Sequence, residues 1–472
     1  MVKLIVSRIH CMTFTSLRCF SAKPKVILDE TISSLLHTED MKHKKHPGII
    51  RPKTPVFPNW ASKEISDILK DHQVSFSEIR TSAQMLLNHL NNRCPPLQEA
   101  KLHEKLLRVE ERLNANSNKK IHIEDIDFNK NHKARNILKQ SIYNWQPINF
   151  DKLTCLTYMV SRTVQNYAVL SKILNEIRVR DEDFKPQTLF DFGSGLGTVI
   201  WAASEIWSNS LKEYLCIEIS KPMIEFSERL AKAAKPKIKN IFYREYLPVS
   251  INPTYDIVVS AHSLFELPGT EARLETILNL WQKTERYLVI VEQGTNAGYK
   301  LVNEARDFIL KYTNSRFKRN IRNGYVFSPC PHDLKCPRFA GSIPCNFEVL
   351  YNPLPFLNKK EHESELYSYV VIKKDKRPEN DEQWPRIVRP VLHRSGHTIC
   401  RMCVASGKLK EEVFTKNKSG KHIYYCAKRS NWGDRLPIHY EEPEDTLEGH
   451  EMTNEETNRK YLRRTHGTKR GI

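Results

Sequence analysis

The sequence has no apolar run long enough to form a membrane-spanning helix. Such a helix needs roughly 18 consecutive apolar residues, and no stretch of the 472 residues approaches that length. Hydrophobic residues nevertheless make up 40% of the chain, which is enough to bury a core and argues against wholesale disorder. We therefore expect a soluble protein of two or three packed units that does not enter a membrane.

Acidic residues are in deficit. The chain contains 74 Lys and Arg but only 55 Asp and Glu, which leaves a formal charge of +19 at pH 7. A positive field of this size attracts polyanions, of which nucleic acid is the most common large example. A membrane surface is a weaker alternative because no single amphipathic basic helix stands out. The charge favours RNA as a partner, and a basic protein without a nucleic-acid partner remains the alternative.

The deficit is complete at the N-terminus, where no acidic residue precedes Asp29. Basic residues are interspersed there with Ser and Thr: Lys3, Arg8, Arg18, Lys23 and Lys25. This composition is typical of a mitochondrial transit peptide, which forms a basic amphipathic helix. We expect residues 1–20 to be a transit peptide cleaved between Phe20 and Ser21, and the protein to lie in the mitochondrial matrix. A frayed basic terminus is the alternative.

Proline interrupts the segment that follows. Residues 21–60 are rich in Lys and Pro, and four prolines there disfavour helix: Pro47, Pro52, Pro55 and Pro58. From about Ala61 to Trp145 apolar residues recur at helical spacing, with separate helices expected at 97–113 and 134–145. We therefore predict an N-terminal helical region over residues 21–150, beginning with an extended lead-in at 21–60.

Between residues 151 and 300 the pattern changes to alternating helices and strands. A helix is predicted from about Asp151 to Arg178. The apolar runs after it are typical of buried parallel strands: TLFDFGS, EYLCIEIS, YDIVVSA and YLVIVEQ. This order predicts an α/β protein with a doubly wound, Rossmann-like sheet of the class I methyltransferase type.

The last third of the chain is cysteine-rich and is predicted to be mainly β. Within residues 301–440 a further strand is predicted at Leu366–Lys374, and the pieces TICRMCV and HIYYCAK indicate a small β-rich unit. Residues 441–472 are first acidic and then basic, which predicts a charged tail.

A glycine-rich loop follows the first predicted strand. Gly193, Gly195 and Gly197 are preceded by Asp191, and a helix is predicted directly after them. Glycine lets the backbone turn sharply and approach a ligand, and the helix start supplies free N–H groups. The acid Glu218 ends the next strand, where it can bind both hydroxyls of a ribose.

This order, D-x-G-x-G-x-G with an acid on the second strand, resembles the class I S-adenosylmethionine-dependent methyltransferases. It differs from the G-x-G-x-x-G of dinucleotide enzymes. The resemblance implies that Gly193, Gly195 and Gly197 line the methionine and ribose of S-adenosylmethionine, with Glu218 on the ribose hydroxyls.

The sequence lacks the catalytic motifs of nucleic-acid methyltransferases. Amino-group enzymes carry an Asn/Asp-Pro-Pro-aromatic tetrad after the fourth strand, where this chain has AHSLFELP. The nucleophilic Cys of cytosine-C5 enzymes is also missing there. His262 and Glu266 are candidate base or positioning groups, although such residues more often cap a strand end. We therefore assign no catalytic residue.

The cysteines cluster in the last third. Cys330, Cys336 and Cys345 form C-x5-C-x8-C between prolines, and Cys400 and Cys403 follow. In a reducing compartment such clustering indicates a metal site before a disulfide, and buried free cysteines are the alternative. Zinc and iron–sulfur clusters both accept four thiolates. The irregular spacing favours a [4Fe–4S] cluster, and the absence of C-x3-C-x2-C indicates that such a cluster is structural or a sensor.

Further segments resemble the mitochondrial methyltransferase-like protein 17 family, which assembles the small ribosomal subunit. They extend from about residue 150 to 440: FDFGSGLGT, CPHDLKCPRF, YSYVVIKK, WPRIVRPVLHRSGH and SNWGD. The resemblance implies a [4Fe–4S] cluster and binding to small-subunit rRNA. By position it implies Cys330, Cys336, Cys345 and Cys403 as ligands, because the C-x-x-x-G turn at Cys403 looks like the ligand of the family. Cys400 has no equally clear counterpart, and Cys426 is expected to be a packing residue.

We therefore predict a monomeric assembly factor of the mitochondrial small ribosomal subunit. It would bind rRNA, S-adenosylmethionine and a structural [4Fe–4S] cluster without catalysis. An active S-adenosylmethionine-dependent rRNA methyltransferase is the alternative. A transferase for a small molecule or a protein is a third hypothesis, which the net charge disfavours.

Overall fold

The computed structural model describes residues 25–73, 75–94, 147–313, 323–356 and 361–441, together with Leu107, Glu110, Glu111 and Asn114. The predicted transit peptide, the helix at 134–145, nearly all of the helix at 97–113 and the tail after residue 441 lie outside the described residues. The chain divides into two compact units, residues 28–437 and the two terminal segments 1–27 and 438–472. In the terminal unit, strands β1 (Lys25–Leu28) and β14 (Ile438–Glu441) pair.

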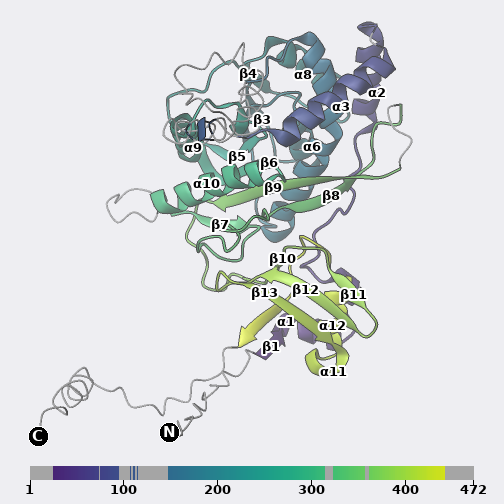
Figure 1. Ribbon diagram of the computed structural model, residues 1–472, viewed down its shortest axis with the longest axis vertical. Coiled ribbons are helices and arrows are strands. Elements are labelled where there is room, and N and C mark those ends of the chain that lie inside the picture. Colours follow the sequence, from purple (N-terminus) through teal and green to yellow (C-terminus); the bar gives the residue numbers. More distant parts are fainter. Residues whose placement is uncertain are drawn as a thin grey trace, which may run out of the picture. The chain divides into compact units, whose positions relative to one another are not determined.

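An eight-stranded sheet forms the centre of the larger unit, in the order β4-β3-β2-β5-β6-β9-β7, with β8 also pairing with β9 (Figure 1). Five strands are parallel: β2 (Thr188–Phe192), β3 (Glu213–Ile217), β4 (Ile241–Arg244), β5 (Tyr255–Ala261) and β6 (Thr284–Gln293). Three antiparallel strands complete it: β7 (Tyr325–Ser328), β8 (Phe347–Tyr351) and β9 (Glu363–Lys373). This parallel core with an antiparallel edge is the predicted class I methyltransferase fold, and its sheet extends past residue 300 to Lys373.

The strands are buried on both faces, as their near-continuous apolar runs predict. Successive side chains point to opposite faces of a sheet. Accordingly Leu189 and Val259 join one core, whereas their neighbours Phe190 and Val258 join the other. Helices cover the two faces (Figure 1): α6 (Lys152–Arg180), α7 (Thr198–Ile206) and α8 (Lys221–Ala233) on the first, α9 (Thr270–Lys283) and α10 (Asn296–Thr313) on the second.

The N-terminal helices pack on the first face. Helices α2 (Asn59–Asp71) and α3 (Phe76–Asn92) bury Ile65, Ile68 and Ile79 in the same core as α6. Helix α6 begins where Asp151 accepts a hydrogen bond from the Thr154 N–H at 2.8 Å, and it is largely buried. Among the described helices, none combines the length and apolar character that crossing a bilayer requires.

The predicted β-rich unit is present, but the prediction for one of its pieces was wrong. Its strands are β10 (Arg386–Ile387), β11 (Leu392–Arg394), β12 (His397–Cys403) and β13 (Leu409–Thr415). The piece HIYYCAK is not β: after a short helix α11 (Lys416–Ser419), it forms α12 (Lys421–Arg429). Adjacent tyrosines favour strands, yet the buried residues Ile423, Tyr424, Cys426 and Ala427 repeat with the helical period.

The prediction of an extended lead-in was also wrong in part. Helix α1 (Glu30–His37) and the 3-10 turn η1 (His43–Lys45) form there, because the four prolines begin only at Pro47 and cannot affect α1. The segment packs against the β-rich unit. His46 hydrogen-bonds to the Ser430 hydroxyl at 3.0 Å, and Asp434 accepts from the Ile50 N–H at 2.9 Å.

Candidate cofactor pocket and cysteine cavity

The glycine loop connects β2 to α7 with three residues in the left-handed region. Gly193, Gly195 and Gly197 have φ angles of 72°, 51° and 89°, which residues other than glycine rarely adopt. A Cβ at Gly193 would lie 2.6 Å from the Ser263 Cβ, whereas a Cβ at Gly195 would meet open space. Gly193 and Gly195 line a pocket, and Gly197 does not. The loop therefore brings bare backbone to the edge of a cavity.

Glu218 faces the same pocket from the end of β3. Its Oε2 accepts a hydrogen bond from the Gly195 N–H at 2.8 Å, and its Oε1 accepts from the Ser220 N–H at 2.9 Å. Burial raises the pKa of this carboxyl, although these hydrogen bonds oppose the shift. Each carboxylate oxygen has a further lone pair, so a carboxylate fixed in this way can still accept from ribose hydroxyls.

Asp191 lies in β2, just before the loop, and does not line the pocket. Its side chain is fully buried, and neither carboxylate oxygen has a hydrogen-bond partner among the described residues. Burial raises the pKa of Asp191 well above the ordinary value, and the nearby charge of Glu218 acts in the same direction. The structure therefore places Asp191 behind the loop, apart from the other four predicted cofactor residues.

The pocket itself has a volume of about 350 Å³ and reaches well beyond the loop. Residues at the carboxyl ends of β5 and β6 form part of its lining, together with Tyr158 and Arg162 of α6 and Leu90 and Arg93 at the end of α3. Small-molecule sites typically measure roughly 300–1,000 Å³. The volume lies at the lower end of this range, which suits a ligand of nucleoside size.

The two residues proposed as a base or positioning group have different surroundings. Glu266 is committed to structural contacts, since its carboxylate accepts from the Arg93 guanidinium at 2.6 Å and from the Ile148 N–H at 3.2 Å. His262 follows β5 with a φ of 59°, and neither of its shielded ring nitrogens has a partner among the described residues. Glu292 and Gln293, which also line the pocket, were not predicted from the sequence. Their signal was a polar pair closing the apolar run YLVIVEQ.

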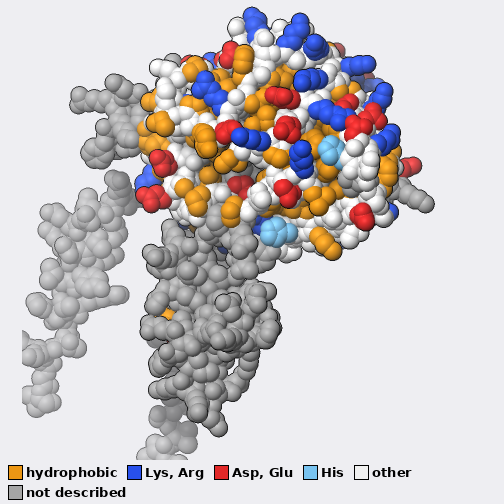
Figure 2. All heavy atoms as spheres, turned by 90° about the horizontal axis from the view of Figure 1, so that it is seen from above, with side chains coloured by type: hydrophobic (Ala, Val, Ile, Leu, Met, Phe, Trp, Pro, Cys, Tyr) orange, Lys and Arg blue, Asp and Glu red, His pale blue; other side chains and the backbone are white. Residues whose placement is uncertain are grey.

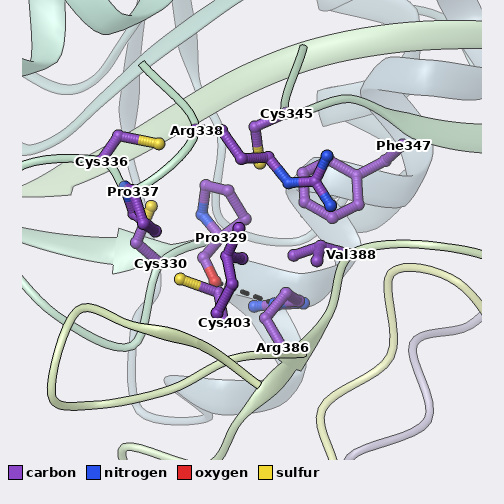
Figure 3. A pocket seen from close by; sticks show the side chains of 11 residues that line it. Pro329, Cys330, Cys336, Pro337, Arg338, Cys345, Phe347, Arg386, Val388 and Cys403 are labelled. Atoms are coloured by element: carbon purple, nitrogen blue, oxygen red, sulfur yellow. Dashed lines mark hydrogen bonds between the residues drawn. The ribbon is translucent and has the colours of Figure 1, made fainter. Parts of the chain in front are cut away.

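Four cysteines line a second, small cavity, of about 10 Å³ (Figure 3). They are the four predicted ligands, Cys330, Cys336, Cys345 and Cys403. The first three come from the segment between β7 and β8, and Cys403 ends β12. Cys400 lies on the same strand and is buried, but it does not line the cavity. Cys426 is buried in α12 and is also absent from the lining, in agreement with its predicted packing role.

Polar groups reach the sulfur atoms of this cavity. His332 Nε2 lies 3.2 Å from Cys403 Sγ, and the Tyr299 hydroxyl donates to Cys336 Sγ at 3.1 Å. Burial raises the pKa of Cys330, and the charge of Arg306 opposes that shift. Such donors and cations stabilise thiolates and tune the metal groups that thiolates bind.

The cysteines of this cavity are not already arranged around a metal ion. In the stretches of chain that the structure describes, no group of three or more His, Cys, Asp or Glu side chains is placed to hold one. Zinc and iron–sulfur clusters both accept four thiolates, so the composition of the lining fits either group.

Arg386 links the cysteine cavity to the methyltransferase sheet. In the register of the β-rich unit it pairs with Cys403, and its side chain lines the cavity (Figure 3). Its Nε donates to the Pro329 carbonyl at 2.9 Å, next to Cys330, and another nitrogen lies 2.6 Å from the Glu176 carboxylate of α6. Helix α6 therefore contributes to both sites, because Tyr158 and Arg162 lie in the pocket lining.

The chain is similar to known mitochondrial proteins. It is 36% identical over 400 residues to the human "Ribosome assembly protein METTL17, mitochondrial", with 84% of this chain and 86% of the human protein covered. It is 21% identical to the Saccharomyces cerevisiae "Ribosome assembly protein RSM22, mitochondrial", with 60% and 67% covered. Both relatives are named as mitochondrial, and the protein is accordingly mitochondrial.

A solved structure and a family model complete the comparison. The magnesium protoporphyrin IX methyltransferase of Synechocystis PCC 6803 with bound SAH is 11% identical, with a TM-score of 0.30, covering 49% of this chain and 90% of that one. So low a TM-score does not support a fold assignment, and the fold is defined by the strand order instead. The model "Mitochondrial small ribosomal subunit Rsm22" matches residues 152–437. Since this match spans more than half of the 472 residues and the human relative is 36% identical, the chain belongs to the Rsm22 family.

Proposed function

We propose that this protein is an assembly factor of the mitochondrial small ribosomal subunit that acts in the matrix as a monomer and binds rRNA. The similarity over 84% of the chain to a protein named for ribosome assembly carries this proposal. The formal charge of +19 supports RNA as the direct partner. On the face shown in Figure 2, Lys and Arg side chains are interspersed with apolar and acidic side chains.

We further propose that Cys330, Cys336, Cys345 and Cys403 hold a [4Fe–4S] cluster. These cysteines line one cavity although 57 residues lie between Cys345 and Cys403. Arg306 and Arg386 place positive charge beside the thiolates. The cluster would be structural: it would bond the segment between β7 and β8 to strand β12.

S-adenosylmethionine is the proposed ligand of the larger pocket. Gly193 and Gly195 would approach its methionine and ribose, and Glu218 would accept from the ribose hydroxyls. The open space at Gly195 and the fixed carboxylate of Glu218 support this assignment. Bound S-adenosylmethionine would bring an activated methyl group to the pocket.

The surroundings of the pocket favour binding without catalysis. The loop after β5 contains no catalytic tetrad, Glu266 is engaged by Arg93, and burial lowers the pKa of His262 to about 3. A histidine with that pKa is a poor general base near neutral pH. One observation favours the second candidate, an active rRNA methyltransferase: the pocket retains buried polar atoms with no protein partner in the described chain.

A rescue experiment separates these functions. In cells that lack the gene we would express Gly195→Asp, which places a carboxylate in the open space of the pocket, and Gly396→Asp as its control. Both glycines have positive φ and open space where a Cβ would lie, but Gly396 belongs to the turn between β11 and β12, away from the pocket. Strain is therefore matched, and only Gly195→Asp should lose S-adenosylmethionine binding.

The readouts are the protein level, small-subunit assembly and the methylation of small-subunit rRNA. Rescue of assembly by both variants supports an RNA-binding scaffold that does not need its cofactor. Failure of Gly195→Asp alone, with one rRNA methyl group missing, supports the enzyme. A protein that does not co-sediment with immature small subunits, or whose RNA affinity does not fall steeply with salt, would contradict both.

A further inference from the structure

The cofactor pocket has a second end that the glycine loop does not reach. In the sheet, β2 lies between β3 and β5. Glu218 follows β3 on one side of β2, whereas His262 follows β5, and Glu292 and Gln293 end β6, on the other side. In open α/β sheets ligands bind at the carboxyl ends of strands around such a switch point. The residues of β5 and β6 therefore face the pocket from the side opposite the proposed ribose contact.

Polar atoms at this end are buried without partners. Within the described chain, no hydrogen bond is made by Glu292 Oε2, Gln293 Oε1 or either ring nitrogen of His262. Glu292 is fully buried, and Gln293 is 6% exposed. Buried polar atoms in folded proteins are nearly always paired. Several unpaired atoms that line one cavity therefore indicate a ligand that completes their hydrogen bonds.

The backbone holds His262 in a strained position. Its φ of 59° lies in the left-handed region, which a residue with a Cβ adopts at a cost. The His262 N–H donates to the Val291 carbonyl at 2.8 Å, which ties the strained residue to the end of β6. Strain of this kind persists where the surrounding structure enforces it, and it concentrates at ligand sites.

The unpaired groups at this end carry little charge. Glu292 Oε1 accepts from the Leu264 N–H at 2.9 Å, and burial raises the pKa of Glu292 to about 8. Burial also lowers the pKa of His262 to about 3. Near neutral pH both groups are therefore largely neutral. The neighbouring cation Arg162 is already paired with Glu365 at 2.9 Å. What remains is a set of donors and acceptors without net charge.

Aromatic side chains line the same pocket. Phe150, Tyr158, Phe192 and Phe265 all line the pocket. A planar heterocycle with donors and acceptors along its edge fits such surroundings, because bases stack on aromatic rings and are read at their edges. A side-chain amide of a protein offers a similar edge, but the charge of +19 favours an RNA partner.

We propose that this end of the pocket binds an unpaired nucleobase of RNA, recognised at its edge by His262, Glu292 and Gln293, next to the cofactor. The proposal rests on the proposed function, in which the protein binds rRNA and the glycine loop binds S-adenosylmethionine. It requires no methyl transfer. Unpaired bases are the part of RNA that proteins usually read, and extruding one from a stack is least costly where the base is already single-stranded.

The test measures nucleoside and cofactor binding separately by calorimetry on the purified full-length protein. Adenosine, cytidine, guanosine and uridine are titrated at millimolar concentration in the presence of saturating S-adenosylhomocysteine. We expect one base to bind in preference to the others. His262→Ala and Gln293→Ala should each weaken that binding by about tenfold or more, the usual effect of losing a hydrogen bond to a base edge, with little change in S-adenosylhomocysteine affinity.

A matched pair at Glu292 guards against simple misfolding. Glu292→Gln retains an oxygen for the Leu264 N–H and presents an uncharged donor, so nucleoside affinity should be largely kept. Glu292→Ala removes both the acceptor oxygen and the donor, and it should lose nucleoside binding. Melting temperatures of all variants are recorded. The proposal is overturned if no nucleoside binds the wild-type protein, or if His262→Ala and Gln293→Ala weaken S-adenosylhomocysteine instead. A wild-type protein that binds nucleoside but no S-adenosylhomocysteine would refute only the proposed cofactor.

Discussion

Arg386 and Glu176 form a buried ion pair, with 2.6 Å between guanidinium nitrogen and carboxylate oxygen. Burial alone would raise the pKa of Glu176, but the charges of Arg386 and Arg180 outweigh it and lower the pKa to about 2. The pair joins the edge of the cysteine cavity to helix α6. It therefore connects the β-rich unit to the methyltransferase sheet.

Arg386→Met should destabilise the protein strongly, because it leaves the Glu176 carboxylate buried without its main partner. Breaking one side of a buried pair costs about 3–5 kcal/mol. Urea unfolding measures the change. Arg401→Met is the control on the same unit: its pair with Glu411 is exposed, with 3.4 Å between the charged atoms, and its loss should cost at most about 1 kcal/mol. Equal effects of the two substitutions would argue against the link.

Cys330→Ser should remove the iron and the brown absorption of the proposed cluster, and it should lower the melting temperature because metal binding is coupled to folding. Iron content per chain after anaerobic purification is the measurement. Cys400→Ser is the control, since Cys400 is buried on the same strand as Cys403 but does not line the cavity. Unchanged iron in the Cys330→Ser protein would refute the ligand assignment. Stoichiometric zinc in the wild-type protein would refute the cluster.

Glu218→Gln should weaken S-adenosylmethionine binding by roughly tenfold to a hundredfold, the range for losing hydrogen bonds to a charged acceptor. The substitution removes the negative charge that faces the ribose. It also places an NH2 donor opposite a backbone N–H from which the carboxylate accepted a hydrogen bond. Calorimetry gives the affinity. Glu213→Gln, at the exposed start of the same strand β3, should bind like the wild type. Retained affinity in Glu218→Gln would move the ribose site elsewhere.

Acid should destabilise the protein through His46. Burial lowers the pKa of His46 from 6.5 to about 4, so between these values the unfolded chain binds a proton that the folded chain does not. Stability present above pH 6.5 is then lost as the pH falls towards 4, by roughly 1.4 kcal/mol per pH unit for this one group. Unfolding free energies near neutrality and near pH 5 give the slope. His46→Gln should reduce this slope by the amount that corresponds to about one proton. An unchanged slope would contradict the assignment of the pH dependence to His46.

The sequence predicted those parts of the fold that follow from local pattern. The apolar runs of β2, β3, β5 and β6 need burial on both faces, and the glycine loop needs positive φ, so both can be predicted directly from residue order. Helix α12 was missed because its adjacent tyrosines favour a strand, and the helical spacing of Ile423, Tyr424, Cys426 and Ala427 was the signal against that prediction. Helix α1 was missed because of prolines that follow it in the chain.

The two sites differ in the same respect. Cysteines stand out wherever they occur, so a shared metal site could be expected from composition and spacing, whereas the choice of Cys403 over Cys400 came from the resemblance to the family. Glu292, Gln293, Tyr158 and Arg162 have no such signature, because each looks like an ordinary polar residue at the end of a strand or within a helix. Only the tertiary structure reveals that they line one pocket and that some of their atoms lack partners.

The position of β9 determines when the protein can finish folding. Strand β9 lies between β6 and β7. In a chain that folds as it emerges from its N-terminus, β7 therefore has no partner strand until the chain has emerged as far as Lys373. Cys403 comes later still. The three earlier cysteines must therefore wait in an unclosed loop, and the last thiol arrives only with strand β12. Closure of the cysteine cavity is thus a late, long-range event, coupled to the arrival of almost the whole chain.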